Sequence, residues 1–139
     1  MSDAAEAQQK VDGFDAIRSR YIELTGSVPP SIETRIKVAK QAGRLDAVES
    51  IEELRQVLIM NNPLGRKVGQ LVHFSQLVAL SDAAPARLHA RSAYKAGATV
   101  AELVGVAELS LITSGMPAYS LAIEIIGELI EEESGSKTE

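Results

Sequence analysis

Three consecutive segments decide the fold: RKVGQLVHFSQLVAL (residues 66–80), SDAAPARLHARSAYKAGAT (residues 81–99) and AELVGVAELSLITSGMPAYSLAIEIIGEL (residues 101–129). The first belongs to a predicted helix over residues 64–80. That helix is apolar on most of its circumference, so we expect it to be buried on several sides. The two later segments carry helical spacing of apolar residues, interrupted by turn and capping residues.

Capping residues mark where the helices of this region begin. Asp82 is placed to cap the second of them. Thr99 and Glu102 have the spacing of a capping box, in which each side chain accepts a hydrogen bond from the other residue's backbone N–H. Met116 and Pro117 begin the last helix, because proline is tolerated in a first helical turn.

The upstream sequence predicts three more helices. The first covers roughly residues 11–26, where apolar residues recur at helical spacing and a glycine closes the segment. Pro29–Pro30 favours a turn that leads into the second. Ser50 and Glu53 have the form of a capping box that opens the third, and Pro63 ends it.

No segment shows the alternation of a half-buried strand, and no internal repeat is present. The sequence therefore predicts an all-α protein of about seven helices in a single domain over residues 11–131. Residues 1–10 are small and polar, and residues 132–139 form an acidic tail. We expect both ends to be flexible.

Composition excludes several classes of function. The 139 residues carry a formal net charge of −5, which argues against nucleic acid as a partner. There is no cysteine, so disulfides, thiolate zinc sites and cysteine nucleophiles are excluded. No signal peptide and no uninterrupted apolar run of membrane-spanning length is visible, so we expect a soluble cytoplasmic protein with no membrane partner.

The candidate catalytic residues lie in the segments that decide the fold. The two histidines of the chain are His73 and His89. Gln70 and His73 are three residues apart and share one helix face, so two adjacent antiparallel helices would bring Gln70, His73 and His89 together. Arg87 and Arg91 form a cationic ridge, expected about 100° round the helix from His89.

Two interpretations of these residues stay open. In the functional one, an imidazole acts as general acid or base near neutral pH and the arginines hold an anionic substrate. In the structural one, His73 is a core histidine hydrogen-bonded to a carbonyl, and the arginines pair with surface acids. Two histidines without metal-ligand spacing are a poor ligand set, so we expect no metal.

The segment LVALSDAAPARLHARSAYKAGATVAELVGV, followed by TSGMPAYSLA, resembles the carboxymuconolactone decarboxylase family. That family carries a helix ending in an apolar run, a turn, and a histidine-bearing helix in an [R]LH…G-[VA]-[TS] context. A helix with an acidic first turn and a G-x-P-x-A motif follow. The matching positions are Arg87, Leu88, His89, Gly97, Thr99, Glu102, Gly115, Pro117 and Ala118.

Departures from the pattern point to one branch of the family. The related alkylhydroperoxidase D-like branch carries a Cys-x-x-Cys and an upstream glutamate, which correspond here to Asp82, Pro85 and Gln70. Without a thiol, disulfide-linked peroxide reduction cannot occur, so we rank peroxidase activity last. The resemblance implies the alkylhydroperoxidase D-like helical fold and the cysteine-less, decarboxylase-type branch.

The resemblance also implies a function. We expect an enzyme that acts on a small carboxylate or lactone, with decarboxylation as the favoured reaction and no cofactor. In this hypothesis His89 is the proton donor, Gln70 and His73 line the pocket, and Arg87 or Arg91 anchors a carboxylate. Members of the family are usually trimers or hexamers, so a homotrimer or homohexamer is expected. The alternative is a non-enzymatic member that binds a small ligand or only assembles.

Overall fold

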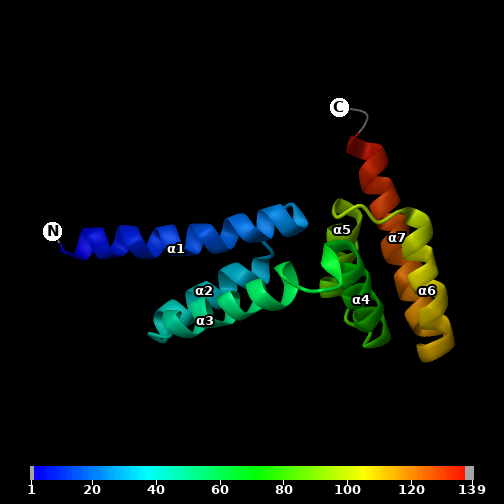
Figure 1. Ribbon diagram of the computed structural model, residues 1–139, viewed down its shortest axis with the longest axis horizontal. Coiled ribbons are helices and arrows are strands. Elements are labelled where there is room, and N and C mark those ends of the chain that lie inside the picture. The colour runs from blue at the N-terminus through cyan, green and yellow to red at the C-terminus, as the bar shows by residue number, and fades with distance from the viewer. Residues whose placement is uncertain (1, 137–139) are drawn as a thin grey trace. The chain divides into compact units, whose positions relative to one another are not determined.

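The computed structural model describes the backbone of residues 2–136 and the side chains of residues 14–135. Within this range the chain forms seven α-helices and no strand, which confirms the all-α prediction (Figure 1). Part of the predicted flexible ends, Met1 and residues 137–139, lies outside the described residues. The helices are α1 (Ser2–Thr25), α2 (Pro30–Gln41), α3 (Leu45–Arg55), α4 (Gly65–Ala79), α5 (Ala83–Lys95), α6 (Val100–Ser114) and α7 (Met116–Ser136).

The chain divides into two compact units, one ending at Leu58 and the other beginning at Ile59. Each unit has a hydrophobic cluster of its own. The prediction of one domain over residues 11–131 stays a prediction.

The first unit is built from α1, α2 and α3. Phe14, Ile17 and Tyr21 recur at helical spacing on α1 and are buried against residues of α2 and α3. The Tyr21 hydroxyl donates a 3.0 Å hydrogen bond to the carboxylate of Glu52, a buried residue of α3. Arg35 donates to the same carboxylate oxygen at 3.3 Å, so the buried charge of Glu52 is paired.

One predicted helix start in this unit is wrong. The capping box at Ser50 and Glu53 would begin a helix there, but α3 begins at Leu45 and places Ser50 inside the helix. Val48 is buried and Leu45 half-buried in the same core, so the apolar face extends further upstream than the capping pattern. Packing of this face therefore outweighs a local capping signal. After α3 the helix widens into a π-helical turn over Gln56–Met60.

The second unit consists of α4, α5, α6 and α7. Figure 1 shows α4 beside α5 and α6 beside α7, and α7 also contacts α4 and α5. Phe74 and Leu103 are fully buried in the shared core. The fully buried apolar residues that α5 contributes to this core are all alanine (Ala86, Ala90 and Ala93), so neighbouring helices can approach it closely.

The predicted capping box of α6 is present, whereas the predicted side-chain cap of α5 is not formed. In the capping box, the Thr99 hydroxyl accepts from the Glu102 N–H at 3.1 Å and the Glu102 carboxylate accepts from the Thr99 N–H at 2.9 Å. Asp82 occupies the cap position of α5, but its side chain makes no capping hydrogen bond. Ser81 adopts a positive φ of 59° and closes α4, which lets α5 return antiparallel to α4 after a short turn.

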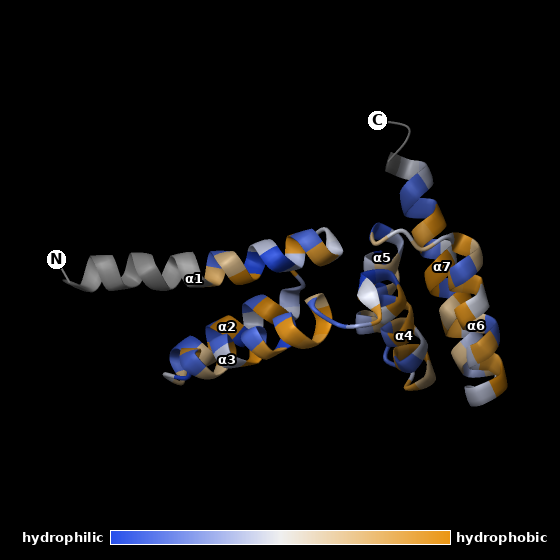
Figure 2. Cartoon of the chain, viewed as in Figure 1, coloured by the Kyte–Doolittle hydropathy of each residue, from blue (hydrophilic) through white to orange (hydrophobic). Residues whose placement is uncertain are grey.

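Part of the apolar surface of the second unit is exposed. Leu109 and Ile112 on α6 are 71% and 84% exposed, and Figure 2 shows hydrophobic residues along much of this helix. Among the described residues, none of the helices combines the length and the hydrophobicity that crossing a bilayer requires.

Candidate active site

The packing of α4 against α5 brings together the three residues that the sequence analysis assigned to catalysis. Gln70 and His73 lie on α4, and His89 lies on α5. Nδ1 of His89 is 2.6 Å from Oε1 of Gln70. The rings of His73 and His89 are stacked, with centroids 4.6 Å apart and planes inclined by 23°. We call Gln70, His73 and His89 the imidazole–amide cluster.

The Gln70 side chain determines which nitrogen of His89 carries its proton. Gln70 is only 1% exposed, so its amide is held inside the unit. An amide oxygen can only accept a hydrogen bond, and the neighbouring Nδ1 must therefore donate. A neutral His89 then has its lone pair on Nε2, and a protonated His89 has a second N–H there. Nε2 is thus the ring nitrogen that Gln70 does not engage.

The ring of His73 packs on the face of the His89 ring. Both imidazole rings are half-buried, so neither is sealed in the hydrocarbon core. Stacking on His73 and the bond to Gln70 together restrict rotation of the His89 ring. The hypothesis that His73 is a core histidine bonded to a carbonyl is thus incomplete, because its ring packs on a second imidazole.

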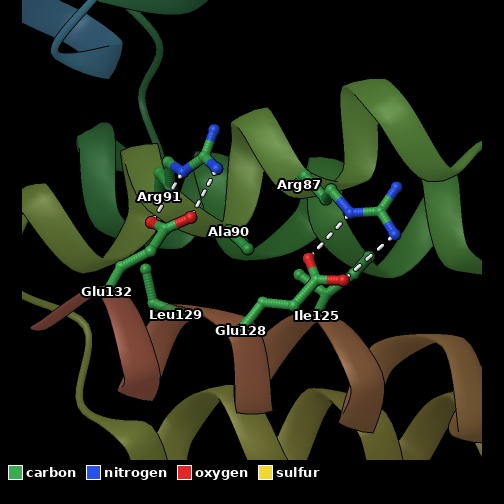
Figure 3. Close-up of a pocket in the computed structure, with 7 residues that line it drawn as sticks. All are labelled: Arg87, Ala90, Arg91, Ile125, Glu128, Leu129 and Glu132. Carbon is green, nitrogen blue, oxygen red and sulfur yellow. Dashed lines mark hydrogen bonds and ion pairs between the residues drawn. The ribbon is translucent and has the colours of Figure 1, made fainter. Parts of the chain in front are cut away.

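Arg87 and Arg91 lie on a different face of α5 from His89. Residues two positions apart on a helix are separated by about 200°, so the expected angle of about 100° from His89 is wrong. His89 points to α4, whereas the two arginines point to α7, where Arg87 pairs with Glu128 and Arg91 with Glu132 (Figure 3). The structure therefore does not bring the arginines to the imidazole–amide cluster.

Each of these two ion pairs is bidentate. Arg87 donates to Glu128 at 2.8 and 3.2 Å, and Arg91 donates to Glu132 at 3.0 and 2.7 Å. The pairs flank a shallow hollow between α5 and α7 with a volume of about 10 Å³, the space of about one water molecule. The pairing with acids that the structural interpretation expected is what the structure shows.

The ion pairs shift the titration of both glutamates. Hydrogen bonds from Arg87 lower the pKa of Glu128 below its usual 4.5, and hydrogen bonds from Arg91 do the same to the pKa of Glu132. Since a lowered pKa means that folding favours the ionised carboxylate, this contribution to stability is complete above about pH 4.5. It is lost as the pH falls through the lowered pKa values.

This shift predicts a difference in acid stability. A variant with both Glu128→Gln and Glu132→Gln should lose less stability than the wild type when the pH falls from 6 to 3, because it lacks the carboxylates that titrate. Urea unfolding followed by circular dichroism at each pH measures the difference. Glu131→Gln, an exposed change on the same helix, is the matched control and should follow the wild type. Equal losses in the double variant and the wild type would contradict the prediction.

The first turn of α4 also carries an arginine that the sequence analysis did not consider. Arg66 lies one turn before Gln70 and two turns before His73, so the three share a face of α4. Among the described residues, no group of three or more His, Asp or Glu side chains is arranged to hold a metal ion.

Comparison with known proteins identifies the family. The model of the carboxymuconolactone decarboxylase family matches residues 46–128, which is more than half of the chain and includes the whole imidazole–amide cluster. The chain belongs to this family. No curated protein matches the chain.

A solved structure supports the fold of the carboxymuconolactone decarboxylase family. A protein from Burkholderia xenovorans LB400, provisionally named carboxymuconolactone decarboxylase, superposes with a TM-score of 0.71. The match covers 91% of this chain and 98% of the other, at 21% sequence identity. At that identity the likeness shows the shared fold and leaves the reaction to be argued from the residues.

Proposed function

We propose that this member of the carboxymuconolactone decarboxylase family is an enzyme that decarboxylates a small carboxylate or lactone by acid–base chemistry at His89. The observation that carries the proposal is the 2.6 Å contact between Gln70 Oε1 and His89 Nδ1. With Nδ1 engaged by Gln70, this contact supports Nε2 as the atom that transfers the proton.

The reaction needs one proton and a stabilised anion. The bond between the substrate carbon and its carboxylate breaks, CO₂ leaves, and the electron pair moves through a conjugated C=C–C=O system to the carbonyl oxygen. The resulting dienolate takes a proton on carbon from Nε2–H of the His89 imidazolium. His89 is left neutral with Nδ1–H still donated to Gln70, and solvent returns the proton.

In this proposal Gln70 and His73 position the His89 ring. Gln70 contacts Nδ1, and His73 packs against the ring face, so the His89 ring is held in place before a substrate arrives. A general acid held in this way typically contributes about 10²–10⁴-fold to the rate.

Arg87 and Arg91 take no part in this proposal. Each guanidinium already has a carboxylate in bidentate geometry, so a substrate would have to displace Glu128 or Glu132. Glu124 lies 3.8 Å from Arg87 and adds a third negative charge to that face. A substrate carboxylate is repelled there more than it is held.

The experiment is a turnover screen with a matched variant. Purified protein is incubated with lactones that bear carboxylates, with β-keto acids and with related carboxylates, and CO₂ release is measured. Release by the wild type that is lost in His89→Gln supports the proposal. Full turnover by His89→Gln contradicts it, and no turnover with the whole panel favours the non-enzymatic alternative.

We also propose that the chain assembles as a homotrimer or homohexamer. The exposed side chains of Leu109 and Ile112 on α6 support this, because a monomer would leave both in water. The molar mass in solution, measured by light scattering, should be three or six times the 14.8 kDa of one chain. A monomer mass at micromolar concentration would contradict it.

A further inference from the structure

An exposed apolar face runs across two neighbouring helices of the second unit, α4 and α6. On α4, Val68, Val72 and Ala79 are exposed and share one row with Ser75, at positions i, i+4, i+7 and i+11. The hydroxyl of Ser75 lies 3.5 Å from that of Ser110 on α6. The exposed row of α4 therefore runs beside α6.

The outer side of α6 continues this face. Four residues of α6 lie in one row at i, i+4, i+8 and i+11, on the side away from the buried Leu103 and Ala107: Ala101, Gly105, Leu109 and Ile112. Leu109 and Ile112 are the most exposed of them, and Figure 2 shows hydrophobic residues along both helices. We call the exposed rows, Val68, Val72 and Ala79 with Ala101, Gly105, Leu109 and Ile112, the α4–α6 face.

The size of the α4–α6 face is that of a small protein interface. Fully burying a large aliphatic side chain removes on the order of 100 Å² of apolar surface, so the exposed fractions correspond to about 300 Å² on one copy. Interfaces are about 60% apolar, which implies about 500 Å² for each copy and about 1,000 Å² for a pair of copies. Specific interfaces begin at this size.

Charge lies at the border of the face and not within it. Lys67 and Glu102, in the first turns of α4 and α6, pair with each other at 3.1 Å at one end of the face. This arrangement of an apolar centre and a polar rim is typical of protein–protein interfaces.

We infer that the α4–α6 face binds the same face of a second copy of the chain about a two-fold axis; this inference rests on the proposed assembly. Gly105 supports it, because a Cβ at this position would meet no atom of another element within 4 Å. Packing within the chain therefore does not require a glycine there, although glycine weakens a helix. When two copies of α6 pack antiparallel, Leu109 of each copy lies over Gly105 of the other, so the same contact forms twice.

A two-fold contact also selects between the two proposed assemblies. It joins copies in pairs, so the number of copies is even, which a homohexamer satisfies and a homotrimer does not. In a hexamer three such pairs form together, and their joint closure strengthens contacts that are small individually.

Filling the space at Gly105 tests the contact. Gly105→Leu should halve the molar mass in solution, from six to three times 14.8 kDa, and should raise the concentration of half-dissociation roughly a hundredfold. Ile112→Glu, which places a carboxylate on the same face, should have the same effect. Gly127→Leu is the matched control, because Gly127 is an exposed glycine within α7 whose Cβ would also meet no atom within 4 Å. It should keep the mass of the wild type. Light scattering measures the mass, and circular dichroism checks that each variant is folded.

Self-cross-linking tests the two-fold axis. The chain has no cysteine, so Leu109→Cys introduces a single thiol near the middle of the face. Close to a two-fold axis a residue meets its own copy, and this variant should give a covalent dimer with a short bismaleimide on a denaturing gel. Leu54→Cys on α3, at a side chain that is also more than half exposed, should not. Adding Gly105→Leu to Leu109→Cys should abolish the dimer.

The outcomes separate this inference from the proposed assembly. A trimeric wild type, an unchanged mass in Gly105→Leu, or an equal fall in Gly127→Leu each overturns the two-fold contact at the α4–α6 face. Covalent dimers from Leu54→Cys and none from Leu109→Cys overturn it as well, and they would place the contact between copies on α3. If the wild type is a trimer or hexamer in these cases, the proposed assembly stands and only the face is wrong. A monomeric wild type contradicts both.

Discussion

Replacing His89 by glutamine is expected to lower kcat for decarboxylation by about 10²–10⁴-fold. The substituted amide has nearly the size of the ring and can still bond to Gln70, but it cannot deliver a proton near neutral pH. Initial rates of CO₂ release at saturating substrate measure the change. The substrate is whichever carboxylate the turnover screen identifies.

Controls for this variant come from the same two helices. Lys95→Gln is an exposed change on α5, six residues after His89, and should keep the wild-type rate. His73→Gln removes the stacked ring but leaves the bond between Gln70 and His89, so its loss of rate should be smaller, roughly tenfold. A larger loss of rate in His73→Gln than in His89→Gln would mean that His73, and not His89, is the proton donor.

Replacing Phe74 by alanine is expected to lower the free energy of unfolding by about 3–5 kcal/mol. Phe74 is fully buried in the core of the second unit, in one cluster with Val78 and the alanines of α5. Those alanines have no rotatable atoms with which to fill the space left by the ring, so a cavity remains. Urea denaturation followed by far-ultraviolet circular dichroism measures the difference.

The matched control for Phe74 is a large apolar residue outside the core. Leu80→Ala, at the end of α4, removes a side chain that is 74% exposed, and it should change the free energy of unfolding by less than about 0.5 kcal/mol. A loss below about 1 kcal/mol for Phe74→Ala would mean that neighbouring helices collapse into the cavity. Such collapse would also shift the adjacent His73.

Several helix boundaries were predictable because their causes lie within a few residues. Pro30 begins α2 after Pro29 in extended conformation, and the hydroxyl of Thr99 caps α6. Gly115, at φ 86°, separates α6 from α7 where the sequence placed the break. Backbone sterics and capping hydrogen bonds act over one turn, so a short stretch of sequence contains all the information they need.

The same local rules were wrong where packing competes with them. Ser50 and Glu53 match a capping box, yet burial of the face that carries Val48 extends α3 back to Leu45. A cap is worth about 1 kcal/mol, whereas burying one large aliphatic side chain contributes about 1.5–3 kcal/mol. Burial of the apolar face therefore determines where α3 begins.

The candidate site was also predictable only in part from the sequence. The sequence by itself determined that Gln70 and His73 share a face, since both lie on one helix, and that a short turn returns His89 antiparallel to them. Only the tertiary structure decided what the arginines do, because Glu128 and Glu132 each lie 41 residues along the chain from their partners. Helical periodicity carries information along one helix, but the choice of a partner across an interface depends on how whole helices pack.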